Sequence, residues 1–240
     1  MLRSMFAIVV LFVFTLTVQT QAGVVPALDA DFNTDIVGQA PDYSLPGDPV
    51  GDRISSGGTN VISVVSGAGE MTDQPLKITR TGSGGITQFK LVPELRTCES
   101  YVLKWTAMME SSQASTTFTI RDTGSGTKAV MGFWGSQLWT GLPYSTIFPD
   151  VGYSSPVGHA FTFKLTMNVT AGSYSLSLNG TPVPEMQDYP LYGGDFDRME
   201  VAFGGAGGDY IFIDDISVMA DCSFVATEKT SWGALKSYYR

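Results

Sequence analysis

The sequence has one histidine, two cysteines and few basic residues. A single histidine excludes a metal site built from several histidines and a proton relay that needs two imidazoles. Lys and Arg number 14 against 23 Asp and Glu, which gives a formal net charge of −9. Nucleic acids and anionic membranes attract basic surfaces. We therefore expect neither as a partner.

Only the N-terminus carries a long apolar run. Arg3 precedes the uncharged stretch Met5–Val18, and a short polar stretch ending in Ala22 follows it. A positive start, a short apolar stretch and a small residue are typical of a secretory signal peptide, whereas a membrane helix needs about 20 apolar residues. We predict a signal peptide over residues 1–22 and a secreted or cell-surface protein with no membrane span in the mature chain. A membrane anchor is the alternative.

Sustained helical periodicity is absent before residue 228, and alternation of apolar and polar residues takes its place. Ala160–Val169 and Ser173–Leu178 alternate strictly, and Thr170–Gly172 between them is short enough for a hairpin. Further strands are predicted at Val61–Val65, Leu76–Thr79, Ile86–Val92, Tyr101–Met109, Thr116–Arg121, Ala129–Trp134, Met199–Phe203 and Tyr210–Met219. Many short strands without helices predict an all-β antiparallel sandwich or barrel.

The last predicted strand contains an irregularity. The apolar residues Ile211 and Ile213 stand at odd positions, whereas Ile216 and Val218 stand at even positions. The phase therefore slips by one residue at Asp214–Asp215, which is what a β-bulge does. Two adjacent carboxylates there need solvent, hydrogen-bond donors or a cation, because burying an unpaired charge is costly.

Three segments carry a family resemblance. His159–Gly180 resembles the central hairpin of laminin-G-like and concanavalin-A-like jelly rolls, Ile213–Val218 resembles their closing strand, and Leu28–Phe32 resembles their opening strand. The resemblance implies a two-sheet jelly-roll β-sandwich over residues 23–222. This superfold hosts lectins, glycanases, lyases, adhesion modules and inert spacers, so it does not fix a function.

The two cysteines become a candidate pair once export is assumed. Cys98 lies just before the strand Tyr101–Met109, and Cys222 lies just after the last predicted strand. If these strands are antiparallel neighbours, both sulfurs fall at the same end. An oxidising compartment then favours a disulfide between them. Two separate buried thiols are the alternative.

A structural calcium ion is the one cofactor that the resemblance implies. Many jelly rolls of this type hold calcium near their opening and closing strands, and Asp29, Asp31 and Asp215 would converge there if those strands pair. Calcium prefers carboxylate and carbonyl oxygens. Solvated carboxylates at a sheet edge are the alternative.

Carbohydrate is the ligand class that the fold favours, because sugar rings stack on aromatic side chains. The segment from residue 133 to 144 contains Trp134, Trp139 and Tyr144 among turn residues, and Tyr153 follows. We predict these four as glycan-binding residues. Core packing of Phe133 and of one tryptophan is the alternative.

Catalysis has weaker support in the sequence. Glycosidases need two carboxylates at defined separations, and the sequence contains no run of the kind Glu-x-Asp-x-x-Glu that would place such a pair on one strand face. A Ser–His–Asp triad would have to use His159, which falls where laminin-G-like domains place a structural histidine. We expect a non-catalytic binding or surface protein, with a polysaccharide-active enzyme and a purely structural surface protein as alternatives.

Residues 223–240 have a different character. Trp232, Leu235 and Tyr239 share one face of a predicted short C-terminal helix. This ending resembles a short tail on secreted proteins of some uncultured bacterial lineages, which implies a sorting or anchoring signal. Docking of the tail on its own sandwich is the alternative.

Overall fold

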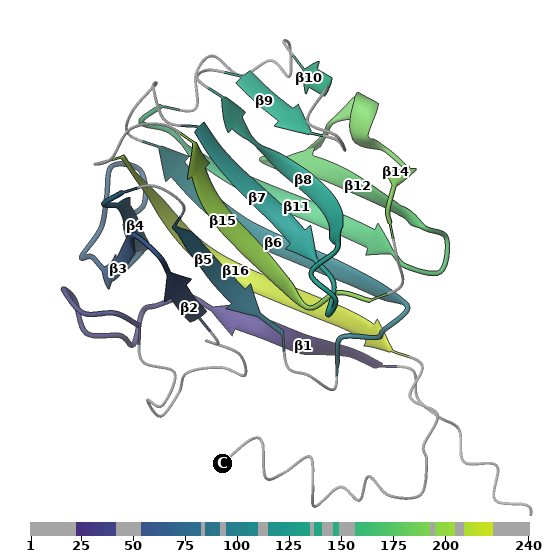
Figure 1. The fold of residues 1–240 in the computed structure, drawn as a ribbon, viewed down its shortest axis with the longest axis horizontal. Helices are drawn as coiled ribbons and strands as arrows, with labels where there is room; N and C mark the ends of the chain where they lie inside the picture. Colours follow the sequence, from purple (N-terminus) through teal and green to yellow (C-terminus); the bar gives the residue numbers. More distant parts are fainter. Residues whose placement is uncertain are drawn as a thin grey trace, which may run out of the picture.

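Two antiparallel sheets, A and B, face each other in a computed structural model of the chain (Figure 1). The predicted signal peptide and the predicted C-terminal tail lie outside the described residues. The structure describes residues 23–41, 54–82, 85–91, 95–109, 115–134, 137–140, 146–148, 157–192, 195–204 and 209–222. Side chains are not described at 54–56, 134, 137–140, 146–148 and 204.

Sheet A contains nine strands within the described residues, in the order β13-β12-β11-β6-β16-β4-β3, with β1 beside β16 and β14 beside β12. Their bounds are β1 Gly23–Ala30, β3 Asn60–Val64, β4 Leu76–Arg80, β6 Ser100–Met109, β11 Ala160–Asn168, β12 Ser173–Leu178, β13 Thr181–Pro182, β14 Tyr189–Pro190 and β16 Tyr210–Cys222. A 3-10 turn, η2, spans Pro184–Met186.

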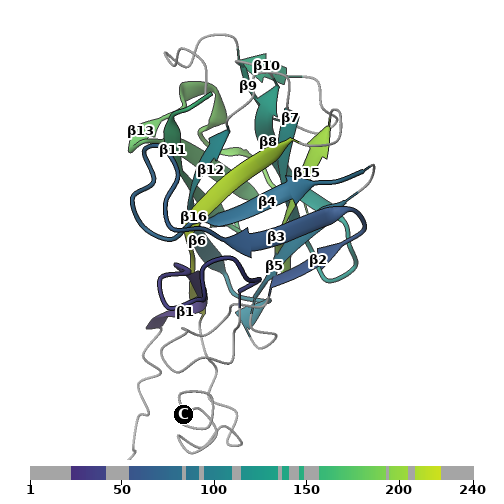
Figure 2. The ribbon, with the colours of Figure 1, turned by 90° about the vertical axis from the view of Figure 1, so that its left-hand side faces the viewer.

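Sheet B contains seven strands, again counted over the described residues, in the order β10-β9-β8-β7-β15-β5-β2. Their bounds are β2 Ile54–Gly57, β5 Ile86–Lys90, β7 Ser115–Arg121, β8 Thr127–Trp134, β9 Gln137–Thr140, β10 Thr146–Phe148 and β15 Arg198–Gly204. The view in Figure 2 shows strands of both sheets from the side that carries β3 and β4. No helix among the described residues has the length and apolar character of a membrane span.

The core lies between the sheets and is rich in aromatic rings. Trp105 of β6 stacks on Phe163 of β11, with ring centroids 4.7 Å apart. From sheet B, Phe118 of β7 lies 5.2 Å from the Trp105 ring, and Phe133 of β8 lies 5.3 Å from the Phe163 ring. Large buried rings dominate core energetics. The alternative that Phe133 packs in the core is therefore confirmed.

The alternation of the sequence becomes the two faces of each strand. In β11, the apolar residues Phe161, Phe163, Leu165 and Met167 are buried. The polar residues between them face outward. The predicted hairpin is confirmed, since β11 pairs with β12 from Phe163↔Leu178 to Asn168↔Ser173, which leaves residues 169–172 as its loop.

The predicted bulge is also confirmed. The register between β16 and β6 shifts between Asp214 and Ser217, and Asp215 has a φ of 51°. Asp214 pairs with Thr106 and Ser217 with Lys104, so Asp215 and Ile216 together face Trp105. The opening strand β1 pairs with the closing strand β16, which was the condition for Asp29, Asp31 and Asp215 to converge.

Several short strands were not predicted. β2, β9, β10, β13 and β14 have between two and four residues each. Segments this short show no clear alternation of apolar and polar residues. Whether they form strands depends on a neighbouring strand with which their backbone can pair. Gln137–Thr140, which we expected to be turn, is a strand because it pairs with β8.

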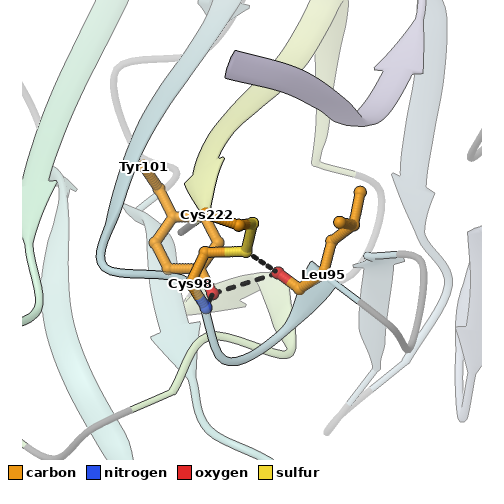
Figure 3. Close-up of a disulfide and its surroundings, with 4 residues drawn as sticks. All are labelled: Leu95, Cys98, Tyr101 and Cys222. Atoms are coloured by element: carbon orange, nitrogen blue, oxygen red, sulfur yellow. Dashed lines mark hydrogen bonds between the residues drawn. A yellow bond between two sulfur atoms is a disulfide. The ribbon is translucent and has the colours of Figure 1, made fainter. Parts of the chain in front are cut away.

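The predicted disulfide joins the segment just before β6 to the end of β16 (Figure 3). Cys98 and Cys222 are 124 residues apart in sequence and 4.5 Å apart at Cα. Tyr101 Oη accepts a hydrogen bond from the Cys98 amide at 2.8 Å and donates one to the Leu95 carbonyl at 3.0 Å. Burial raises the pKa of Tyr101 to about 12, so this donor stays protonated.

Removing the disulfide should destabilise the sandwich without changing its fold. A Cys98→Ser/Cys222→Ser double variant should lose about 2–5 kcal/mol of unfolding free energy, because an open loop of this length regains entropy in the unfolded chain. Urea denaturation of the variant, with reduced wild-type protein as the control, measures the loss. Equal midpoints for variant and oxidised wild type would contradict the expectation.

Candidate functional site

Two of the four predicted aromatic residues lie on one hairpin of sheet B. Trp134 ends β8 and Trp139 lies in β9, and the backbone register pairs Trp134 with Gln137 and Trp139 with Gly132. The side chains of both tryptophans, together with Tyr144 and Tyr153, lie outside the described part of the structure. Their role in glycan binding stays a prediction.

Next to this hairpin, the outer face of sheet B carries charged and polar side chains. On β15, Met199 and Val201 are in the core, so Arg198 and Glu200 lie on the opposite face. Arg198 pairs in register with Lys90 of β5 and with Arg121 of β7, and Glu200 pairs with Gln88 and Thr119. We call these six residues the sheet B outer face.

Glu200 lies at the centre of this face between two arginines. Its Oε1 accepts from Arg198 Nε at 2.8 Å and from Gln88 Nε2 at 3.0 Å, and its Oε2 accepts from Arg121 Nε at 2.8 Å. The residue is only 5% exposed. Burial alone would raise the pKa of Glu200, but the hydrogen bonds and charges of Arg121 and Arg198 outweigh it and lower the pKa. Glu200 therefore stays ionised at neutral pH.

A second carboxylate extends the network. Asp197 Oδ2 accepts from Arg198 Nη1 at 2.7 Å, and Asp197 Oδ1 lies 2.8 Å from Arg96 Nε. Hydrogen bonds and charges from Asp197 and Glu200 raise the pKa of Arg198 against the opposing effect of burial. Because Arg96, Asp197, Arg198 and Glu200 each pair with an opposite charge, these side chains have fixed positions.

The turn between β7 and β8 is held to the same region by Lys128. This lysine is 2% exposed, and its Nζ donates to the Tyr192 carbonyl at 2.9 Å. Its Nζ also lies 3.6 Å from Asp195 Oδ1 and 3.9 Å from Asp122 Oδ2. Asp195 in turn accepts from the Thr123 hydroxyl at 2.6 Å. The turn thus packs against the end of sheet B.

We did not predict the sheet B network from the sequence. Its signal is present in residues 197–201, where Arg198 and Glu200 alternate with Met199 and Val201. The same pattern is typical of an ordinary solvated strand face. Only the register shows that these charges meet Arg121, which belongs to a distant segment of the chain.

A group of carboxylates lies on sheet A where β16 changes neighbours. β4 pairs with residues 210–213 of β16, and β1 pairs with residues 216–222. Asp214 and Asp215 lie between the part of β16 that pairs with β4 and the part that pairs with β1. Asp29 pairs with Ser217 close by. We call Asp29, Asp31, Asp73, Asp214 and Asp215 the acidic group.

The charges of the acidic group influence one another. Burial raises the pKa of Asp214 to about 7, with further contributions from Asp215, Asp73 and Asp31, against a lowering hydrogen bond from the Asp215 amide. Burial also raises the pKa of Asp29, and the charges of Asp31 and Asp215 add to that effect. These carboxylates are therefore within electrostatic reach of one another.

The expected calcium ligands do not form a ready coordination group. Among the described residues, no set of three or more His, Cys, Asp or Glu side chains is placed so that it could hold a metal ion. Asp29, Asp31 and Asp215 influence one another electrostatically without meeting that condition. Calcium binding stays a prediction.

His159 lies apart from both groups. Its Nδ1 is 2.9 Å from Glu70 Oε1, and Glu70 Oε2 accepts from the Ala160 amide at 2.8 Å. The hydrogen bond from the Ala160 amide, followed by that from His159, lowers the pKa of Glu70. Glu70 thus connects the segment before β4 to the start of β11, which agrees with a structural role for His159.

Replacing Asp214 tests the acidic group. The raised pKa means that the folded state holds a proton that the unfolded state has lost, so wild-type stability should fall as the pH rises from about 4 to about 7. Asp214→Asn should remove most of this fall and gain about 1–2 kcal/mol at pH 8, since solvent screens part of the charge interaction.

Urea denaturation at pH 5 and pH 8 in EDTA measures this difference. Asp221→Asn is the matched control, because Asp221 is an exposed aspartate on the same strand. A pH dependence that Asp214→Asn leaves unchanged would show that another group causes it.

Calcium binding has a separate test. On this prediction, millimolar Ca²⁺ added after EDTA raises the melting temperature by several degrees, because a ligand that binds only the folded state stabilises it. Asp215→Asn should abolish the rise. An identical melting temperature with and without Ca²⁺ would refute calcium binding.

No protein-family model matches the sequence, and no curated protein matches it. Solved structures do match the fold. A carbohydrate esterase from the Shiga toxin-encoding bacteriophage phi24B is 12% identical, with a TM-score of 0.55 over 83% of this chain and 100% of that chain. A sialidase is 11% identical, with a TM-score of 0.54 over 81% of this chain and 19% of that chain.

A structure of botulinum neurotoxin type C, whose cell entry depends on interaction with two ganglioside molecules, is also similar. It is 14% identical, with a TM-score of 0.51 over 82% of this chain and 48% of that chain. The chain thus spans under a fifth of the sialidase and about half of the toxin chain. At these identities the similarity shows a shared β-sandwich fold and nothing finer.

Proposed function

We propose that this chain is a secreted, non-catalytic carbohydrate-binding β-sandwich of the laminin-G-like or concanavalin-A-like type. The observation that carries the proposal is the sheet B outer face, where polar side chains have fixed positions beside the strands of Trp134 and Trp139. A sugar needs oriented donors and acceptors for its hydroxyl groups and an aromatic plane for its apolar face. This region of the sheet supplies both residue types.

Fixed polar groups suit this role because binding then costs little ordering. Glu200 is held by Gln88, Arg121 and Arg198, so these side chains lose little rotamer freedom when a ligand arrives. The backbone register continues from Thr117 of β7 through Gly132 of β8 to Trp139 of β9. We place the glycan site across this face of sheet B, from the Glu200 network toward Trp139.

Two further observations support export and a glycan ligand. The Cys98–Cys222 disulfide suits an oxidising compartment. Among the similar structures, the neurotoxin is described as interacting with gangliosides and the phage protein as a carbohydrate esterase. Both descriptions concern carbohydrate, although each belongs to that protein alone.

A polysaccharide-active enzyme is the second candidate, and one observation favours it. A general acid must keep its proton near neutral pH, and the pKa of Asp214 is raised to about 7 beside several other carboxylates. This would place catalysis on sheet A. Glu200 on sheet B does not suit the role of acid, because its two arginine partners lower its pKa.

A glycan-array screen of the exported full chain tests the proposed function. We expect selective binding that Trp139→Ala weakens about tenfold or more, because buried aromatic anchors dominate binding energy. Trp232→Ala in the tail is the matched control and should bind like wild type. The melting temperatures of all three proteins verify folding.

Each outcome of the screen leads to a different conclusion. Binding that Trp139→Ala leaves intact would refute the location of the site. Absence of binding to any glycan would refute the proposal and favour a structural surface role. Release of reducing sugar that Asp214→Asn abolishes would establish the enzyme instead.

A further inference from the structure

We propose that the glycan site on sheet B selects polysaccharides that carry carboxylate or sulfate groups, through a basic row formed by Lys90, Arg198 and Arg121. The inference rests on the proposed function, because it names the ligand class of that site.

The basic row crosses three adjacent strands. Arg198 of β15 pairs in register with Lys90 of β5 and with Arg121 of β7, so the three residues are direct cross-strand neighbours on the sheet B outer face. Like charges placed directly opposite each other destabilise a sheet. Such a row therefore needs negative charge from elsewhere.

The protein supplies only part of that negative charge. Three guanidinium groups, those of Arg96, Arg121 and Arg198, share the two carboxylates of Asp197 and Glu200. Lys90 makes no ion pair or side-chain hydrogen bond with any residue in the described ranges. The row keeps excess positive charge in a chain whose formal net charge is −9.

The free donors lie at the two ends of the row. Arg198 in the middle is fully engaged, with Nε, Nη1 and Nη2 donating to Glu200, Asp197 and Ser125. Arg121 uses Nε on Glu200 and Nη1 on Ser125 and Thr127. Its Nη2 has no hydrogen-bond partner among the described residues, and its side chain is 26% exposed.

A ligand anion would complete this arrangement. A carboxylate or sulfate can accept from a guanidinium N–H and pair with a nearby ammonium, and both interactions are stronger than neutral hydrogen bonds. Arg121 is oriented in advance by Glu200, and Lys90 is free to move toward the ligand. The row lies on the same sheet face as the polar groups proposed to contact sugar hydroxyls.

Sheet A offers the matched comparison. Lys104 of β6 pairs in register with Lys164 of β11, and both side chains are exposed to solvent. No arginine–carboxylate network surrounds them in the described part of the chain. Solvation alone suffices for this pair, so it should not contribute to anion selection.

The test compares polysaccharides that differ only in charge. Polygalacturonate with free carboxylates is paired with its methyl ester, and dextran sulfate is paired with dextran. The full chain should bind at least one charged form about tenfold more tightly than its neutral counterpart, and added salt should weaken this binding.

Variants assign the selectivity to the row. Lys90→Gln removes no ion pair or side-chain hydrogen bond with a described residue, and we expect it to reduce the preference for the charged form severalfold. Lys90→Gln/Arg121→Gln should abolish the preference, with melting temperature as the control for folding. Lys104→Gln/Lys164→Gln should retain it.

The outcomes separate this inference from the proposed function. Equal binding of charged and neutral forms that still depends on Trp139 would overturn the inference and leave the proposed function standing. A preference lost equally in Lys104→Gln/Lys164→Gln would overturn the basic row in favour of general charge attraction. Absence of binding to every polysaccharide would refute both.

Discussion

The pairing of β16 inside sheet A is the constraint on which the rest of the sandwich depends. This last strand lies between β6 on one side and β4 and β1 on the other. It also carries Cys222 of the disulfide and the bulge at Asp214–Asp215. Without β16, sheet A would separate into three parts, namely the β6 side, the β4–β3 pair and β1.

Alternation and turn chemistry predict much of this fold, because they act through neighbours in sequence. Phe161, Phe163 and Leu165 identify a strand face without any partner, and the parity change after Ile213 identifies the bulge. The disulfide follows from two cysteines that flank strands expected to be neighbours. The short strand β9 could not be predicted in this way, since its existence depends on a ladder with β8.

The candidate site is harder to predict because its contacts join distant segments. Arg121 and Glu200 are 79 residues apart, and Gln88 and Glu200 are 112 apart. A charged residue on an alternating strand is consistent with solvent exposure, and only the register of β5, β15 and β7 decides whether its neighbour has the same or opposite charge. Two of the predicted aromatic residues, Trp134 and Trp139, nevertheless fall on the same sheet as the observed charges.

The sheet B network also has a mechanical consequence. Glu200 contacts β5 through Gln88 and β7 through Arg121 at the same time, so any force that slides β15 along its neighbours must separate buried opposite charges. A slip of one residue would turn Glu200 toward the aromatic core, where an unpaired carboxylate is strongly unfavourable. Under tension along the strands, this network should resist shear more strongly than apolar packing alone, because dispersion contacts can re-form after a small displacement and fixed ion pairs cannot.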